Sequence, residues 1–157
     1  MRFYDPTVIR TLLVASANRC AYSGCEQPLT DPGWKQLNAE IAHICGERPG
    51  APRYDPKMSE ADRTALSNLV LLCPNHHTMV DELMPDAHPV QLLREMKEHH
   101  EHLDPSGRPV AGEPWVSDPE LQRLAVLLME ASGAVMIDWL CDDDSVEIEI
   151  EIEIEEL

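Results

Sequence analysis

The chain is poor in the residues that usually build a large core. Aromatic residues make up only 4% of its 157 residues, while proline occurs 13 times. A small core follows, and a bound structural metal would help to hold it together. Lysine and arginine number 12 against 29 acidic residues, which gives a net charge of −17. This balance excludes a uniformly basic surface, so binding to any polyanion must depend on local patches, a metal or a partner.

Membrane and secretory signals are also missing. No apolar run approaches the roughly 20 residues that cross a bilayer. The best run, residues 124–129, is interrupted by Glu130. The first residues include no apolar signal region. The cysteines number five, and an odd count argues against a complete disulfide framework and for metal binding or free thiols in a reducing compartment. We therefore expect a cytoplasmic protein without a membrane partner.

The hydrophobic pattern predicts a mixed α+β chain. Asp5 and Pro6 are typical of a helix start, and Asn18 is expected to end that helix. Strands are predicted at 37–44 and 69–72, and helices at 60–66, 75–83, 89–103 and 119–140. A segment rich in proline and glycine, residues 105–117, is interpreted as a linker between residues 1–104 and 118–157.

The last twenty residues have an unusual composition. Residues 138–157 contain ten acidic residues and no basic ones, so residues 1–137 carry only −7 of the total charge. From Val146 onward, apolar residues alternate with glutamate as in a strand. A lone strand cannot bury its isoleucine face. It could join a partner's sheet edge, pair with copies of itself, remain a low-complexity tail, or mimic DNA and block a basic loop.

Four residues have the chemistry of a closed zinc site. Cys20 and Cys25 flank a short knuckle with a glycine, and Cys73 and His76 are three residues apart where a strand meets a helix. Structural zinc prefers four thiolate or imidazole ligands in a tetrahedron. The alternative is that the four residues are unconnected, two of them buried as small hydrophobes. The other cysteines have no partner spacing and are interpreted as ordinary thiols: Cys45 and Cys141.

Three further residues, a histidine, an asparagine and a second histidine, follow one another at marked positions along the chain. His43 ends one apolar run, Asn68 opens a second, and His77 follows the Cys73–His76 pair. The stretch 8–103 resembles the HNH endonuclease family. The resemblance implies a ββα-metal unit, in which a two-stranded hairpin and one helix hold a divalent ion, on a zinc-bound treble-clef-like core with flanking helices.

The resemblance also implies roles for these residues. His43 would be the general base, Asn68 would hold the hairpin loop and orient that base, and His77 would hold a catalytic Mg²⁺ or Mn²⁺ ion. Neighbours on a helix point about 100° apart. Since His76 and His77 are adjacent, we expect His76 to serve the zinc and His77 the catalytic ion.

The chain departs from the family pattern at position 42, where many members carry an acidic metal ligand and this chain has Ala42. Glu40 lies on the same strand face and is a possible ligand. Asp81, one helical turn after His77, would buttress it, unless it is a simple surface charge. The local basic residues are assigned to phosphate contact, although a solvated loop would look the same: Arg48, Arg53, Lys57 and Arg63.

The sequence therefore predicts a metal-dependent endonuclease that acts on DNA. Similar modules occur in bacterial restriction and phage-defence effectors, which implies control by a partner or by assembly. We expect residues 118–157 to mediate homo-oligomerisation or binding of a regulatory protein. Two alternatives stay open, a nuclease-inactive zinc-binding interaction module and an RNA-directed nuclease or nickase.

Overall fold

The computed structural model describes residues 3–31, 33–101 and 116–133. It combines helices with one small antiparallel sheet, which confirms the predicted α+β class. In chain order the elements are α1 (Pro6–Ser16), β1 (Glu40–His43), α2 (Glu60–Arg63), the 3₁₀ turn η1 (Leu66–Asn68), β2 (Leu69–Leu72), α3 (Pro74–Thr78), the π-helical turn η2 (Met79–Leu83), the 3₁₀ turn η3 (Pro85–Ala87), α4 (Val90–His100) and α5 (Asp118–Ala131). No helix among the described residues is long and apolar enough to span a membrane.

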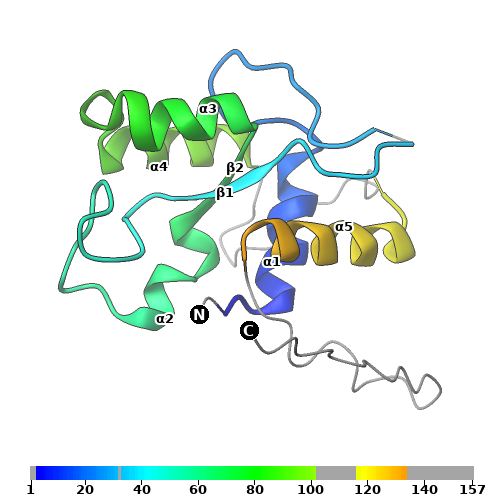
Figure 1. Cartoon of the computed structure of the whole chain (residues 1–157), viewed down its shortest axis with the longest axis horizontal. Helices are drawn as coiled ribbons and strands as arrows, with labels where there is room; N and C mark the ends of the chain where they lie inside the picture. The colour runs from blue at the N-terminus through cyan, green and yellow to red at the C-terminus, as the bar shows by residue number, and fades with distance from the viewer. Residues whose placement is uncertain (1–2, 32, 102–115, 134–157) are drawn as a thin grey trace, which may run out of the picture.

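The two strands form the centre of the molecule. Their register pairs Glu40 with Leu72 and His43 with Leu69. Helices α3 and α4 lie on one side of the hairpin, and α1 and α5 lie on the other (Figure 1). Every residue of β2 is buried, as expected for a short apolar strand covered on both faces. The hairpin therefore links the two helical halves.

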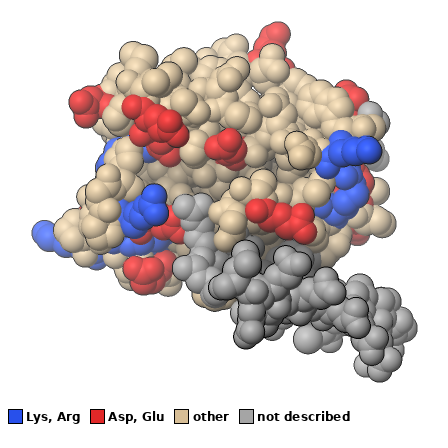
Figure 2. Space-filling view, viewed as in Figure 1, with Lys and Arg blue, Asp and Glu red and all other residues tan. Residues whose placement is uncertain are grey.

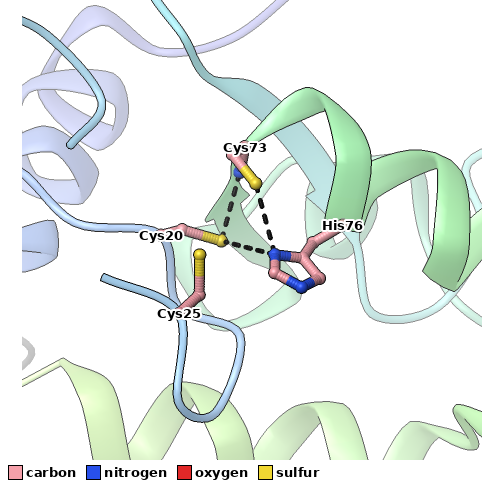
Figure 3. A group of neighbouring side chains, drawn as sticks. All are labelled: Cys20, Cys25, Cys73 and His76. Carbon is pink, nitrogen blue, oxygen red and sulfur yellow. Dashed lines mark hydrogen bonds between the residues drawn. The ribbon is translucent and has the colours of Figure 1, made fainter. Parts of the chain in front are cut away.

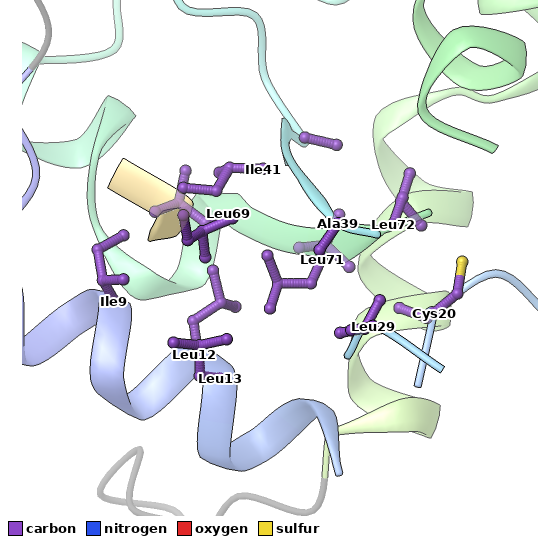
Figure 4. Packing of buried hydrophobic residues seen from close by; sticks show 14 of the residues in the cluster. Ile9, Leu12, Leu13, Cys20, Leu29, Ala39, Ile41, Leu69, Leu71 and Leu72 are labelled. Atoms are coloured by element: carbon purple, nitrogen blue, oxygen red, sulfur yellow. The ribbon is translucent and has the colours of Figure 1, made fainter. Parts of the chain in front are cut away.

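Helix α1 supplies much of the core. Its N-terminus is capped by the Asp5 carboxylate, which accepts a hydrogen bond from the Thr7 backbone amide at 2.7 Å. The apolar face of the helix is fully buried at Ile9, Leu12 and Leu13. These side chains face the leucines of β2 (Figure 4). Burial of a leucine-sized side chain contributes about 1.5–3 kcal/mol, so this contact holds the hairpin on α1.

Helix α5 belongs to the same core. Leu124, Ala125 and Leu128 have no exposed surface, and α5 packs against α1 and β1. Its apolar face is therefore covered within the chain rather than left for another molecule. The remainder of the predicted association region, residues 134–157, lies outside the described residues, as do residues 105–115 of the predicted linker, so association through 118–157 stays a prediction.

Several elements are shorter than the sequence indicated. Strand β1 begins at Glu40 rather than residue 37, because Asn38 bonds instead to the backbone of Leu29 and Pro28. Helix α2 ends at Arg63 rather than residue 66. The Asn68 side-chain nitrogen donates a hydrogen bond to the Arg63 carbonyl at 3.0 Å. Helix α5 ends at Ala131 rather than residue 140, followed by Gly133 with a left-handed φ of 70°.

Candidate metal centre and active-site cleft

The first half of the candidate metal centre is a tight hairpin. Arg19 and Pro28 form a β-bridge, and the Cys20 amide donates to the Gln27 carbonyl at 3.1 Å. At its tip the chain turns through Gly24, whose φ of 78° favours glycine. The hairpin brings the thiols of Cys20 and Cys25 to the same place (Figure 3).

The second half lies where β2 meets α3. Cys73 is the N-cap of α3, and Pro74 occupies its first position. His76 follows within the first turn, so its ring faces the Cys73 thiol (Figure 3). The ring Nδ1 of His76 lies 3.2 Å from Cys73 Sγ and 3.6 Å from Cys20 Sγ.

The four predicted zinc ligands therefore come together. One ligand atom from each of Cys20, Cys25, Cys73 and His76 lies within 4.8 Å of all the others. A tetrahedral zinc ion, with bonds of about 2.3 Å to sulfur and 2.0 Å to nitrogen, places its ligands roughly 3.6 Å apart. The observed spacing and the donor types both fit a zinc ion held by three thiolates and one imidazole.

The electrostatics of the cluster disfavour a thiolate that has no compensating charge. Burial, together with the neighbouring thiols of Cys73 and Cys25, raises the pKa of the Cys20 thiol to about 12 when no ion is present. Burial, with the nearby His88, lowers the pKa of His76, which keeps its ring neutral and able to act as a ligand. Three thiolates in one place need a compensating cation, and this is the charge that a divalent metal supplies.

Two residues that the sequence analysis did not single out lie near His76, a predicted zinc ligand. The ring of Tyr22 stacks on it, with centroids 4.0 Å apart and planes 4° from parallel. The Tyr22 hydroxyl lies 3.1 Å from His88 Nε2. Because His88 Nδ1 donates to the Met84 carbonyl at 2.7 Å, its Nε2 accepts from Tyr22. The position of Tyr22 inside the Cys20–Cys25 knuckle is the one signal that could have indicated it, whereas no sequence signal indicated His88.

A cleft with a volume of about 640 Å³ lies beside the metal centre. Its walls come from β1, the loop 46–53, the helical stretch α3–η2, and the end of α5 through Leu128, Ala131 and Ser132. The loop folds tightly on itself, since a Cβ at Gly46 would collide with the Pro52 carbonyl. The sequence gave no sign that α5 forms part of this cleft.

His77 lies in the cleft between two carboxylates. Its Nδ1 is 2.9 Å from Glu40 Oε2 on β1, and its Nε2 is 3.5 Å from Asp81 Oδ2, one helical turn later. Glu40 reaches the ring because it is paired with Leu72, two residues before α3 begins. All three residues line the cleft, and the Glu40 side chain is 45% exposed. Thus His76 and His77 face different surroundings, while their assignment to two different ions stays a prediction.

His43 lines the same cleft from the end of β1, although it is only 8% exposed. The Tyr4 hydroxyl lies 3.3 Å from its Nε2, and the two rings stack with centroids 6.1 Å apart. Tyr4 is 39 residues away in the sequence and was not anticipated. Its contact limits the rotation of the His43 ring.

Asn68 is buried beneath the loop that follows β1. Its side-chain oxygen accepts from the Cys45 amide at 2.8 Å, and its side-chain nitrogen donates to the Cys45 and Arg63 carbonyls at 3.0 Å each. Its backbone carbonyl accepts from the Ile44 amide at 2.8 Å. These bonds hold the backbone just beyond His43, so Asn68 affects that histidine through the chain.

The predicted phosphate-binding residues divide into two pairs. Arg48 and Lys57 are exposed. Arg63 is only 2% exposed and donates to the carbonyls of Gly46, Asp55 and Met58. The Arg53 side chain is 7% exposed and is also bonded internally. The buried pair, Arg53 and Arg63, therefore holds the loop that follows β1. Phosphate contact stays a prediction for Arg48 and Lys57.

The surface around the cleft is not strongly basic. On the face shown in Figure 2, acidic and basic side chains are interspersed, and the described residues there form no continuous basic patch. No protein-family model matches the chain, and no curated protein matches it. Function is therefore inferred from the geometry and chemistry of these two neighbouring sites.

Proposed function

We propose that the chain is a metal-dependent endonuclease of the HNH type that hydrolyses phosphodiester bonds in DNA. The observation that carries this proposal is the convergence of His43, Glu40 and His77 on one cleft. They come from a β-hairpin and the helix that follows it directly, which is the element order of a ββα-metal unit. The Cys3His cluster at the strand–helix junction agrees with the zinc-bound core of this family.

The cleft offers ligands for a divalent cation. Glu40 Oε2 and His77 Nδ1 are 2.9 Å apart. Adjacent ligands of an octahedral Mg²⁺ ion, with bonds of about 2.1 Å, lie roughly 3.0 Å apart. This separation is compatible with Glu40 and His77 acting as neighbouring ligands of one Mg²⁺ or Mn²⁺ ion. Ala42 is fully buried and offers no ligand, so Glu40 takes the part that an acidic residue at position 42 has elsewhere in the family.

When bound, the ion supplies positive charge that stabilises the phosphate and the leaving oxygen. The residues of the chain supply the rest. His43 removes a proton from the attacking water, for which a neutral imidazole is suited near pH 7. Tyr4 and Asn68 hold His43 and the backbone after it in place. Arg48 and Lys57 contact the phosphate backbone of the substrate.

The zinc has a structural part in this proposal. A zinc ion held by these four residues would join the knuckle, through Cys20 and Cys25, to the start of α3, through Cys73 and His76, and would fix the orientation of the helix. His77 is the next residue of that helix. A fixed α3 therefore keeps the His77 ring in the cleft, opposite Glu40. The family resemblance also implies control by a partner or by assembly, as in bacterial defence effectors. We include this control in the proposal.

A second function is favoured by the charge of the cleft. Its described lining includes four acidic residues, Glu40, Glu47, Asp81 and Glu82, against two arginines, Arg48 and Arg53, and the guanidinium of Arg53 is bonded internally. This acidity would repel a nucleic acid when no cation is bound. A nuclease-inactive zinc module that binds a protein partner accounts for the same arrangement, and an RNA-directed nuclease or a nickase would use the same residues.

Incubation of the purified, zinc-loaded protein with supercoiled plasmid tests the proposal. With Mg²⁺ or Mn²⁺ we expect linear product, and EDTA should abolish cleavage within the time in which zinc is retained. Accumulation of relaxed circles alone would identify a nickase. Cleavage of single-stranded RNA but not of plasmid would identify the RNA-directed enzyme. If neither substrate is cleaved with either ion, the zinc interaction module becomes the better account.

A further inference from the structure

Arg53 occupies an unusual position in the cleft loop. Its backbone has a left-handed φ of 58°, which is uncommon for a residue with a side chain. Its guanidinium is nearly buried and has four polar partners. Nε donates to the Ile44 carbonyl at 2.9 Å, Nη1 to the Val80 carbonyl at 3.2 Å, and Nη2 to the His43 carbonyl at 3.2 Å and to the Asp81 carboxylate.

These partners belong to the two halves of the cleft. The His43 and Ile44 carbonyls lie at the end of β1, whereas Val80 and Asp81 lie in η2, one turn beyond His77. A single planar group with fixed donors thus joins the strand that carries His43 to the helix that carries His77. This is a different arrangement from an arginine that extends into solvent to meet a phosphate.

The contact with Asp81 has a consequence for His77. Arg53 holds Asp81 Oδ1, and the other oxygen, Oδ2, faces His77 Nε2 at 3.5 Å. A carboxylate on one nitrogen of an imidazole fixes the ring and leaves the opposite nitrogen for a metal. Here the opposite nitrogen is Nδ1, which faces Glu40 at 2.9 Å.

We propose that Arg53 is a positioning residue of the cation site, which keeps Asp81 outside the ligand shell and directs His77 Nδ1 toward Glu40. The inference rests on the proposed function, since it assigns roles around the ion that Glu40 and His77 would hold. The guanidinium neutralises Asp81, so this carboxylate gains little by turning toward a cation. Without Arg53, the Asp81 carboxylate loses its counter-charge and can turn from His77 Nε2 toward the cation, where it would fill a coordination position that is otherwise open.

The test measures Mn²⁺ binding to the full-length, zinc-loaded protein by electron paramagnetic resonance. His77→Ala provides the background from unrelated carboxylates, and the binding lost in this variant defines the site. Arg53→Met is compared with Arg53→Lys, which retains the charge beside Asp81. Arg63→Met is the matched control, because the Arg63 side chain is also largely buried and bonds to loop carbonyls, but Arg63 makes no described contact with Asp81.

We expect Arg53→Met to bind Mn²⁺ about tenfold more tightly and to cleave DNA about 100-fold more slowly. Arg53→Lys should lie between this variant and the wild type. Arg63→Met should melt at a lower temperature with its Mn²⁺ affinity within about twofold of wild type. Unchanged or weaker Mn²⁺ binding in folded Arg53→Met would overturn the inference and leave Arg53 a purely structural role.

Asp81→Asn keeps the proposal testable if Arg53→Met does not fold. An outer-shell Asp81 predicts a roughly tenfold loss of Mn²⁺ affinity with the site retained, whereas complete loss of the site would show that Asp81 is a ligand and overturn the inference. The proposed function fails in a different way. If the wild-type protein shows no Mn²⁺ binding that depends on His77, the cation site itself is absent, and the inference falls with it.

Discussion

Two neighbouring residues of one helix face opposite chemical surroundings. His76 lies among three thiols and under the ring of Tyr22, in a cluster suited to a closed zinc site. His77 lies between the carboxylates of Glu40 and Asp81 in a cleft open to solvent. Sulfur ligands around a filled tetrahedron favour stability, while oxygen ligands with open positions favour chemistry. One turn of helix thus couples a candidate structural zinc site to a site proposed for catalysis.

The largest effect is expected at the thiol cluster. His76→Ala should release zinc and unfold much of the protein, because structural zinc contributes on the order of 10 kcal/mol in small modules. Zinc content by mass spectrometry and a thermal melt measure both consequences. Cys45→Ser is the matched control, since Cys45 is buried but lies outside the cluster. Full zinc content in His76→Ala would remove His76 from the ligand set.

The neighbouring substitution should have a different outcome. His77→Ala should retain zinc and melt within a few degrees of wild type, because His77 is outside the thiol cluster. Its DNA cleavage should fall by about 10²–10⁴-fold with the loss of a cation ligand. If both histidine variants lose zinc, or neither does, the assignment of the two rings to two sites is wrong.

The proposed general base gives a third test of the cleft. His43→Ala should keep zinc and the fold while cleavage drops by about 10²–10⁴-fold. Its Mn²⁺ affinity should stay near that of wild type, since His43 is proposed as a base and not as a ligand. Cleavage at the wild-type rate would remove His43 from the mechanism. Tyr4→Phe, which deletes only the hydroxyl at 3.3 Å, should cost less, about tenfold.

The smallest effect on the fold is expected for removal of the acidic end. Helix α5 is buried against α1, so a deletion that spares it should begin after Gly133. The protein without residues 134–157 should keep its zinc and its melting temperature, and its cleavage should persist or rise because ten acidic charges are gone. Light scattering should show a lower oligomeric state than that of the full chain. Monomers for both proteins would exclude self-association through this segment.

The sequence was most informative where the signals are local. The Cys20–Cys25 knuckle and the Cys73–His76 spacing predicted the cluster, because each pair is fixed by a short stretch of backbone. The run 69–72 predicted β2 with its observed bounds, since four consecutive apolar residues, with a proline two positions after the last, leave few alternatives. The divergence of the two adjacent histidines followed from helix geometry alone.

Long-range contacts could not be anticipated in the same way. A charged residue in a loop rich in glycine and proline looks solvated, so the burial of Arg53 and Arg63 became visible only with the carbonyls that surround them. Tyr4 and His88 meet their partners across 39 and 66 residues. The end of α5 reaches the cleft only because its apolar face packs on α1. Neither hydrophobic periodicity nor residue spacing predicts these contacts.

Plasmid cleavage by wild type and His77→Ala, each first shown to hold one zinc ion, distinguishes the two sites in a single experiment. With Mn²⁺ present, the account predicts that wild type converts supercoiled plasmid to cleaved product and that His77→Ala, equally folded and zinc-loaded, does not. Equal cleavage by the two proteins would contradict a cation site at His77. Absence of cleavage by the zinc-loaded wild type on both DNA and RNA would contradict the proposed nuclease.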